Sequence, residues 1–205
     1  MTAPGAGSVT LRLVVRIAIV AAVVLALAVV EVSSRSGVAW RLITFTYQAN
    51  LLAAGYYLWT LLSPRADARV GLRGAVVLYV LLAGAIWNLL LTEYSMGYTV
   101  ANILLHVVVP VLALSDWLLV GRGGGRVQWW QPLAWLVYPA AYAVVALVVL
   151  NRLGRRAPYY FLDPDLVGVG TVAVNIGVLG AAVLGVGYLL LAVNRLATPA
   201  RIDAV

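Results

Sequence analysis

Six apolar stretches, each long enough to cross a lipid bilayer, limit the fold of this chain more than any other feature. A backbone inside lipid has to satisfy its own hydrogen bonds, and these stretches lack the alternation of polar and apolar residues found in barrel strands. At about 1.5 Å per residue, each stretch crosses the ~30 Å hydrocarbon core as a helix. The sequence therefore predicts an all-α fold, a polytopic membrane bundle of six transmembrane helices forming a single domain over residues 1–205. The predicted spans cover residues 11–32, 40–62, 74–92, 100–120, 132–150 and 168–193.

The composition excludes several other classes of protein. Of 205 residues, 64% are hydrophobic and only 10% are charged, whereas a soluble domain carries about 25% charged residues. The chain has no cysteine, which rules out disulfides, thiolate metal sites and cysteine nucleophiles. Its single histidine argues against a bis-histidine haem, and no His/carboxylate group has metal-ligand spacing. We expect neither a metal nor a cofactor.

Arginine placement predicts the orientation of the bundle. All fourteen basic residues are arginine, and the net charge is +7. Six spans place both termini on one side, which receives nine arginines against five on the other, so the positive-inside rule puts the termini in the cytoplasm. The arginines are scattered over loops and helix ends, which favours this role in a cell membrane over nucleic-acid binding. The nine are Arg12, Arg16, Arg65, Arg69, Arg73, Arg122, Arg126, Arg195 and Arg201; the five are Arg35, Arg41, Arg152, Arg155 and Arg156.

The first stretch has an alternative interpretation as a cleavable signal peptide. Arg12 and Arg16 precede an apolar run, and Ala26-Leu27-Ala28 resembles a cleavage site. The run ends late, however, and Glu31 rather than an exported soluble domain follows it. A membrane-spanning helix is the favoured interpretation.

Polar side chains at membrane depth are the candidate functional residues, because such groups are costly in hydrocarbon. With the predicted orientation, Thr44 lies about 6 Å and His106 about 9 Å below the outer interface. Four amide side chains reach similar depth or share a face with these two. They predict a polar layer in the outer half of the bundle. The candidates are Thr44, Gln48, Asn88, Asn102, His106 and Asn175.

A hydroxyl and a neutral imidazole at matching depth suggest nucleophilic acyl chemistry. Histidine can take the hydroxyl proton as threonine attacks an ester carbonyl, and then return it to the leaving group. The Asn and Gln amides are candidate donors to the oxyanion. An amphiphilic ester among the membrane lipids could enter such a shallow polar layer laterally. The predicted activity is therefore a lipid-ester hydrolase with Thr44 as nucleophile and His106 as base.

A structural role for the same residues stays open. Threonine in a membrane helix commonly bonds its own i−4 carbonyl, and a lone histidine commonly holds helices together. A small transporter is also conceivable because Pro110 and Pro139 could break two helices, although no paired intramembrane charges are evident. Asp116 lies about 15 Å from His106 along the helix, too far to orient it. We expect Asp116 to form a structural ion pair with nearby arginines.

Several strings, in their order and spacing, resemble the Pr6Pr family of bacterial six-span proteins. That family is similar to the eukaryotic androgen-induced family, which includes the androgen-dependent regulator of tissue-factor-pathway inhibitor. The resemblance covers nearly the whole chain. The strings are WRLITF at 40–45, QANLL at 48–52, HVVVP at 106–110 with DW at 116–117, and PYYFLD at 158–163.

The resemblance implies an intramembrane threonine hydrolase that cleaves fatty acid esters of hydroxy fatty acids. Residue by residue, Thr44 matches the nucleophile position and His106 matches the histidine. The resemblance identifies neither an acidic third residue nor an oligomeric state.

A second threonine lies close to the first. Thr44 and Thr46 are two residues apart, so on one continuous helix they would point about 200° away from each other. Only one of them could then face His106. Because the resemblance favours Thr44, we expect the Thr44 hydroxyl to lie against the imidazole and Thr46 to face a neighbouring helix or lipid.

Overall fold

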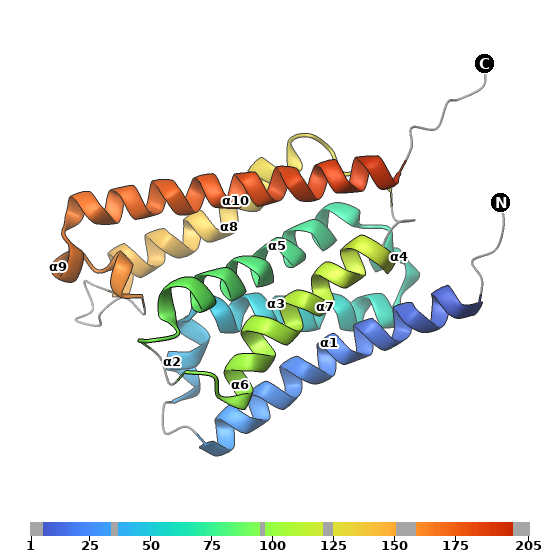
Figure 1. The fold of residues 1–205 in the computed structure, drawn as a ribbon, viewed down its shortest axis with the longest axis horizontal. Coiled ribbons are helices and arrows are strands. Elements are labelled where there is room, and N and C mark those ends of the chain that lie inside the picture. Colours follow the sequence, from blue (N-terminus) through green and yellow to red (C-terminus); the bar gives the residue numbers. More distant parts are fainter. Residues whose placement is uncertain (1–5, 34–36, 95–96, 121–124, 151–158, 199–205) are drawn as a thin grey trace. The chain divides into compact units, whose positions relative to one another are not determined.

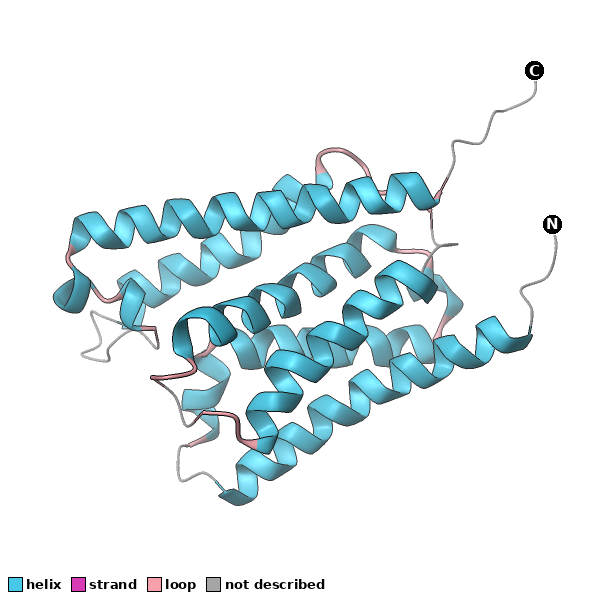
Figure 2. Ribbon diagram, viewed as in Figure 1, coloured by secondary structure: helices cyan, strands magenta, loops and turns pink. Residues whose placement is uncertain are grey.

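A computed structural model describes residues 6–33, 37–94, 97–120, 125–150 and 159–198. Its elements are helices (Figures 1 and 2), and the described residues contain no strand. The all-α prediction is therefore confirmed. The chain forms two compact units. The first extends to Gln128 and includes the chain from Leu190 onward, and the second covers Trp129–Leu189.

Four antiparallel helical segments form a closed ring in the first unit (Figure 1). The first and third segments each pack against the second and the fourth. Apolar side chains fill the interior, among them Ile19, Tyr57, Val80 and Val109, all of which are fully buried. The segments are α1 (Ala6–Ser33), α3 (Phe45–Leu62), α5 (Val70–Ile86) and α7 (Val109–Ser115).

Shorter elements extend or connect these four. α5 runs on into the π-helical segment η1 (Trp87–Leu91), and α7 is preceded by α6 (Val100–Ile103) and the π-helical η2 (Leu104–Val108). Another π-helical segment, η3 (Asp116–Val120), ends the fourth segment. π-Helical turns often occur at functional sites in helices. The connections are α2 (Val38–Ile43) and α4 (Pro64–Asp67).

The predicted span 40–62 is interrupted at Thr44. This residue has an extended backbone (φ −78°, ψ 142°), so α2 ends at Ile43 and α3 begins at Phe45. The Thr44 N–H and hydroxyl both donate to the carbonyl of Arg41, at 3.0 and 2.9 Å. Thr44 thereby satisfies a carbonyl that the end of α2 leaves without an intrahelical partner.

The second unit contains two long helical segments. The first is α8 (Gln131–Val144) with its π-helical continuation η4 (Val145–Leu150). The second is most of α10 (Val169–Ala197), whose last turns from Leu190 belong to the first unit. A side chain at Gly187 would lie 3.1 Å from Pro132, so this glycine permits close approach of α8 and α10. The turns η5 (Tyr160–Leu162) and α9 (Pro164–Val167) precede α10.

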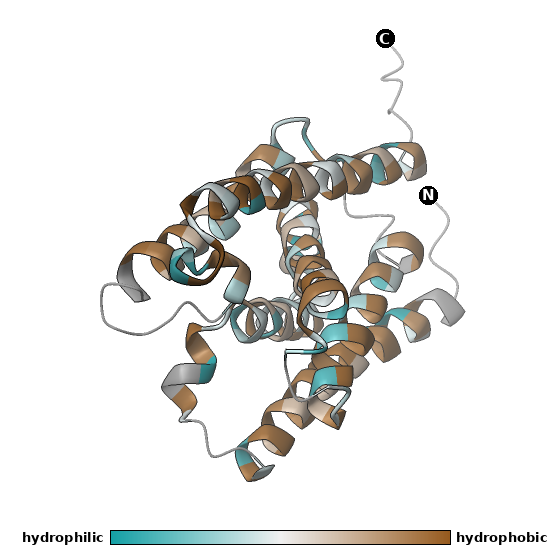
Figure 3. Ribbon diagram, turned by 60° about the vertical axis from the view of Figure 1, so that its left-hand side comes forward, coloured by the Kyte–Doolittle hydropathy of each residue, from teal (hydrophilic) through white to brown (hydrophobic). Residues whose placement is uncertain are grey.

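Among the residues that the structure describes, five helical segments are long and apolar enough to cross a membrane. Hydrophobic residues extend along the helices (Figure 3), and many large apolar side chains are exposed. This architecture is that of a multi-pass membrane protein. α3 is not among the five; it carries polar residues along its length, including Thr46, Gln48, Asn50 and Thr60. The five are Val9–Ser33, Val70–Leu91, Val100–Leu119, Gln131–Val148 and Val169–Ala197.

A buried ion-pair network ties four elements of the first unit together. Asp116 is fully buried, and its carboxylate accepts from Arg16 Nε at 3.1 Å and lies 3.6 Å from Arg73 Nε. Asp67 pairs with the same two arginines, at 2.6 Å for Arg16 Nη2, and with Arg12 at 2.8 Å. The expected ion pair of Asp116 is confirmed. No paired charges were evident in the sequence because the ion pairs of Asp116 with Arg73 and Arg16 join residues 43 and 100 positions apart, which meet only after folding.

Asp67 lies between the spans and bridges the arginines. Burial raises the pKa of its carboxyl, but the hydrogen bond from Arg16 and the charges of Arg73, Arg16 and Arg12 outweigh burial, so the pKa is below its ordinary value. The carboxylate is therefore the stable form of Asp67 when the unit is folded.

The network predicts the effect of removing one buried charge. Asp116→Asn leaves Arg16 and Arg73 buried with less neutralisation, so we expect a loss of about 3–5 kcal/mol in the free energy of unfolding. The measurement is equilibrium denaturation of the detergent-solubilised protein. Glu93→Gln is the matched control because Glu93 is exposed and lies outside this network, and its effect should stay below about 1 kcal/mol. Equal effects of the two substitutions would contradict a stabilising network.

Candidate active site

His106 lies in η2 and points into the ring of the first unit. The residue is 6% exposed, and its Nδ1 lies 3.0 Å from the backbone carbonyl oxygen of Asn102. A carbonyl oxygen only accepts hydrogen bonds, so Nδ1 has to carry the proton. In the neutral ring, Nε2 is then an acceptor with a free lone pair. The Asn102 carbonyl thus fixes both the tautomer and the orientation of the imidazole.

Thr46 supplies the hydroxyl at the other ring nitrogen. Its Oγ1 lies 3.3 Å from His106 Nε2, and the residue is 8% exposed. With Nε2 unprotonated, the threonine hydroxyl donates to the imidazole. A hydroxyl that donates to a histidine held by a third group is the arrangement of an activated nucleophile.

The expectation that Thr44 lies against the imidazole while Thr46 faces away is wrong. The Thr44 hydroxyl donates to the carbonyl of Arg41, and Thr46 makes the contact with His106. Two threonines two residues apart point about 200° away from each other only on one continuous helix, whereas the chain is extended at Thr44. Thr46 is the second residue of α3, so the position of that break decides which threonine faces inward.

Trp87 packs flat against the imidazole. The two ring centroids are 4.7 Å apart with an interplanar angle of 18°, and Trp87 is 3% exposed. The rings of Trp87 and Tyr98 also meet edge to face, with their centroids 5.0 Å apart. Trp87 was not among the residues predicted from the sequence. The available signal was its place beside Asn88 within a predicted apolar span.

A close helix crossing holds the backbone of His106 in place. Pro110 has no N–H to donate to the His106 carbonyl four residues earlier, and Asn88 Nδ2 donates to that carbonyl instead, at 3.1 Å. A Cβ at Gly84 would lie 2.8 Å from the same oxygen and 3.0 Å from the Pro110 ring. Glycine at position 84 therefore lets α5 approach closely enough for Asn88 to reach His106.

The remaining predicted amides are engaged elsewhere. Asn102 contributes its backbone carbonyl, while its side chain donates to Gly97 O at 2.7 Å. Gln48 donates to Leu42 O at 2.8 Å. Asn175 belongs to the second unit and donates to Phe161 O at 2.9 Å.

Asn50 was not among the predicted site residues, although its spacing of four residues from Thr46 places both on one face of α3. Its Nδ2 donates to the Thr46 carbonyl at 2.9 Å and to Leu105 O at 3.4 Å. These bonds connect the threonine's turn directly to the residue before His106. The spacing was visible in the sequence, but the choice of Thr44 over Thr46 kept Asn50 out of the predicted site.

Among the residues that the structure describes, no group of three or more His, Cys, Asp or Glu side chains could hold a metal ion. Comparison with protein-family models, with curated proteins and with solved structures gives no match.

The helix crossing at Gly84 generates a test of the site's architecture. Gly84→Ala forces a methyl group against the His106 carbonyl, and we expect a loss of about 1–3 kcal/mol in stability from overpacking. Gly55→Ala in α3 is the matched control, since a Cβ there meets nothing within 4 Å among the described residues. It should be neutral or stabilising by up to about 1 kcal/mol. Thermal unfolding in detergent measures both, and an unchanged Gly84→Ala protein would contradict the close approach.

Proposed function

We propose that the protein is an intramembrane hydrolase of lipid esters in which Thr46 is the nucleophile and His106 the general base. The observation that supports this is the pair of contacts on the one histidine. Nδ1 donates to the Asn102 carbonyl, and Nε2 accepts from the Thr46 hydroxyl. This arrangement leaves the histidine ready to remove a proton from the hydroxyl.

The reaction that these groups support has two stages. His106 Nε2 takes the hydroxyl proton as Thr46 Oγ1 attacks the ester carbonyl carbon, and then gives that proton to the departing alkoxide. This leaves an acyl-threonine. His106 next takes a proton from water as the water attacks the acyl group, and the proton returns to Thr46 when the acid leaves. The Asn102 carbonyl and the face of Trp87 both favour the imidazolium that forms in each stage.

Thr44 remains the competing assignment for the nucleophile. The resemblance to the Pr6Pr family favours Thr44, whereas the contact with the base favours Thr46. The two residues flank the start of α3, so a two-residue shift in the register of this helix would bring Thr44 to the position of Thr46. Direct comparison of the two single substitutions separates the assignments.

The location we propose is the cell membrane, with α3 as a sixth span. α3 runs antiparallel to α1 and α5 and packs against both (Figure 1). If α1 and α5 cross the bilayer, α3 crosses it beside them. Six spans put both termini on one side, and the arginine distribution favours the cytoplasm. The substrate class implied by the resemblance is a fatty acid ester of a hydroxy fatty acid, reached from the surrounding lipid.

A non-catalytic role is the second candidate, and the burial of the pair favours it. Thr46 and His106 are 8% and 6% exposed, so a substrate has to displace neighbouring side chains to reach them. The same hydrogen bonds would serve to hold helices together. For a small transporter, the buried pairs of Arg16 and Arg73 with Asp116 supply the intramembrane charges that such a function commonly uses.

Covalent labelling by a fluorophosphonate probe, followed by turnover of a panel of lipid esters, tests the proposal. We expect Thr46→Ala and His106→Ala to lower labelling and turnover by about 10³-fold or more, because each removes a member of a unit that acts together. Thr44→Ala is the matched control and should keep both activities, and Thr46→Ser should keep part of them.

Two other outcomes would favour the alternatives, provided that thermal unfolding shows that the variants are folded. Loss in Thr44→Ala alone would move the nucleophile to Thr44. No turnover of any ester by the unaltered protein, together with lowered stability of His106→Ala, would support the non-catalytic role.

A further inference from the structure

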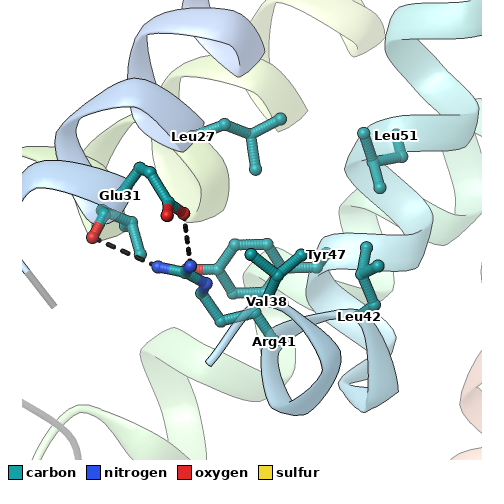
Figure 4. A pocket seen from close by; sticks show the side chains of 8 residues that line it. Leu27, Glu31, Val38, Arg41, Leu42, Tyr47 and Leu51 are labelled. Carbon is teal, nitrogen blue, oxygen red and sulfur yellow. Dashed lines mark hydrogen bonds and ion pairs between the residues drawn. The ribbon is translucent and has the colours of Figure 1, made fainter. Parts of the chain in front are cut away.

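A pocket of about 200 Å³ opens between α1, α2 and α3 (Figure 4). Neither Thr46 nor His106 lines it. Its lining is apolar except at one side, where Arg41 and Glu31 form an ion pair. All of its residues belong to the first unit. The lining consists of Leu27, Val30, Glu31, Val38, Arg41, Leu42, Tyr47 and Leu51.

The two members of this ion pair differ sharply in burial. The Arg41 side chain is 9% exposed, whereas that of Glu31 is 65% exposed. Arg41 Nη1 also donates to the carbonyl of Val30 at 3.2 Å, which holds the guanidinium at the pocket. Glu31 can therefore leave for a more polar environment at little cost, but the arginine stays and needs another anion.

We propose that this pocket binds the carboxylate end of a single-chain fatty acid. The carboxylate takes the place of Glu31 and accepts two parallel hydrogen bonds from Arg41, which is the geometry that guanidinium groups favour. The first methylene groups lie against Leu27, Leu42 and Leu51. The proposal does not depend on ester hydrolysis, and no covalent bond changes.

The size and surroundings of the pocket select this occupant. Pockets for drug-sized ligands are about 300–1,000 Å³, so the smaller volume here fits one end of a single chain and not a two-chain phospholipid. The pocket lies between helices that expose apolar side chains over much of their length, which a lipid chain would satisfy and a water-soluble acid would not.

Two residues that line the pocket also pack against the residues next to His106. Val30 and Tyr47 line the pocket and also pack against the buried cluster of Ala26, Ala101 and Leu105. Tyr47 follows Thr46 in the chain, and Leu105 precedes His106. A bound fatty acid thus lies beside the turn of α3 that carries Thr46.

Direct binding of radiolabelled palmitate to the purified full chain in detergent tests the proposal. We expect saturable binding that Arg41→Gln weakens at least tenfold. Glu31→Gln should tighten it several-fold, because it removes the competing carboxylate. Arg65→Gln, which removes an exposed arginine outside the pocket, is the matched control and should bind as the unaltered protein does. Thr46→Ala should also bind normally, which separates this site from the proposed hydrolysis.

Competition distinguishes the head group. Unlabelled palmitate should displace the label, whereas methyl palmitate, which lacks the carboxylate, should not. Stronger displacement by single-chain lysophosphatidic acid would overturn the carboxylate assignment.

A second variant, Leu27→Trp, tests the pocket without removing a charge. Leu27→Trp fills the pocket while keeping the ion pair, and it should abolish binding even if Arg41→Gln fails to fold. Binding that survives Leu27→Trp, or that Glu31→Gln weakens as Arg41→Gln does, would overturn the proposal.

Discussion

Polar groups inside an apolar ring of helices have to find their partners within the ring, and this constraint accounts for most of the first unit. Two polar levels satisfy it in different ways. One joins His106 to Thr46, Asn102 and Asn88 through hydrogen bonds between neutral groups. The other joins Asp116 to arginines through charge. The two levels are about 15 Å apart along the same helical segment.

Each level is held by a different kind of backbone feature. At the histidine level, Pro110 withholds a donor and Gly84 allows close approach, so the amide of Asn88 reaches the His106 carbonyl. At the charged level, the short helix α4 brings Asp67 to the end of the ring, where it bridges Arg16 and Arg73. Both arrangements place side chains from several helices in fixed positions, as a catalytic site requires.

Much of this organisation could be predicted from hydropathy and spacing. The predicted stretch 100–120 coincides with the helical segment that carries His106, and the ion pair of Asp116 followed from its depth and the neighbouring arginines. Selection of His106 also followed from depth alone. The five apolar spans are of the kind that apolar composition identifies directly.

The remaining details depend on local geometry that hydropathy does not record. The break at Thr44 lies within an otherwise helical pattern, and with it Thr46 rather than Thr44 contacts His106. The stacking of Trp87 on His106 needs the crossing of α5 with η2, which no local pattern indicates. Asn175 shares a predicted depth with the other amides but belongs to the second unit, where it bonds Phe161.

The proposed chemistry depends on His106 carrying its proton on Nδ1 and accepting from Thr46 at Nε2. Because the chain has one histidine, ¹⁵N-histidine labelling of the protein in lipid bilayers gives the NMR signals of this ring alone. We expect a protonated Nδ1 and an unprotonated Nε2 at neutral pH, with the Nε2 shift changed by Thr46→Val and unchanged by Thr44→Val. A protonated Nε2, or a shift that responds to Thr44→Val alone, would contradict the claim.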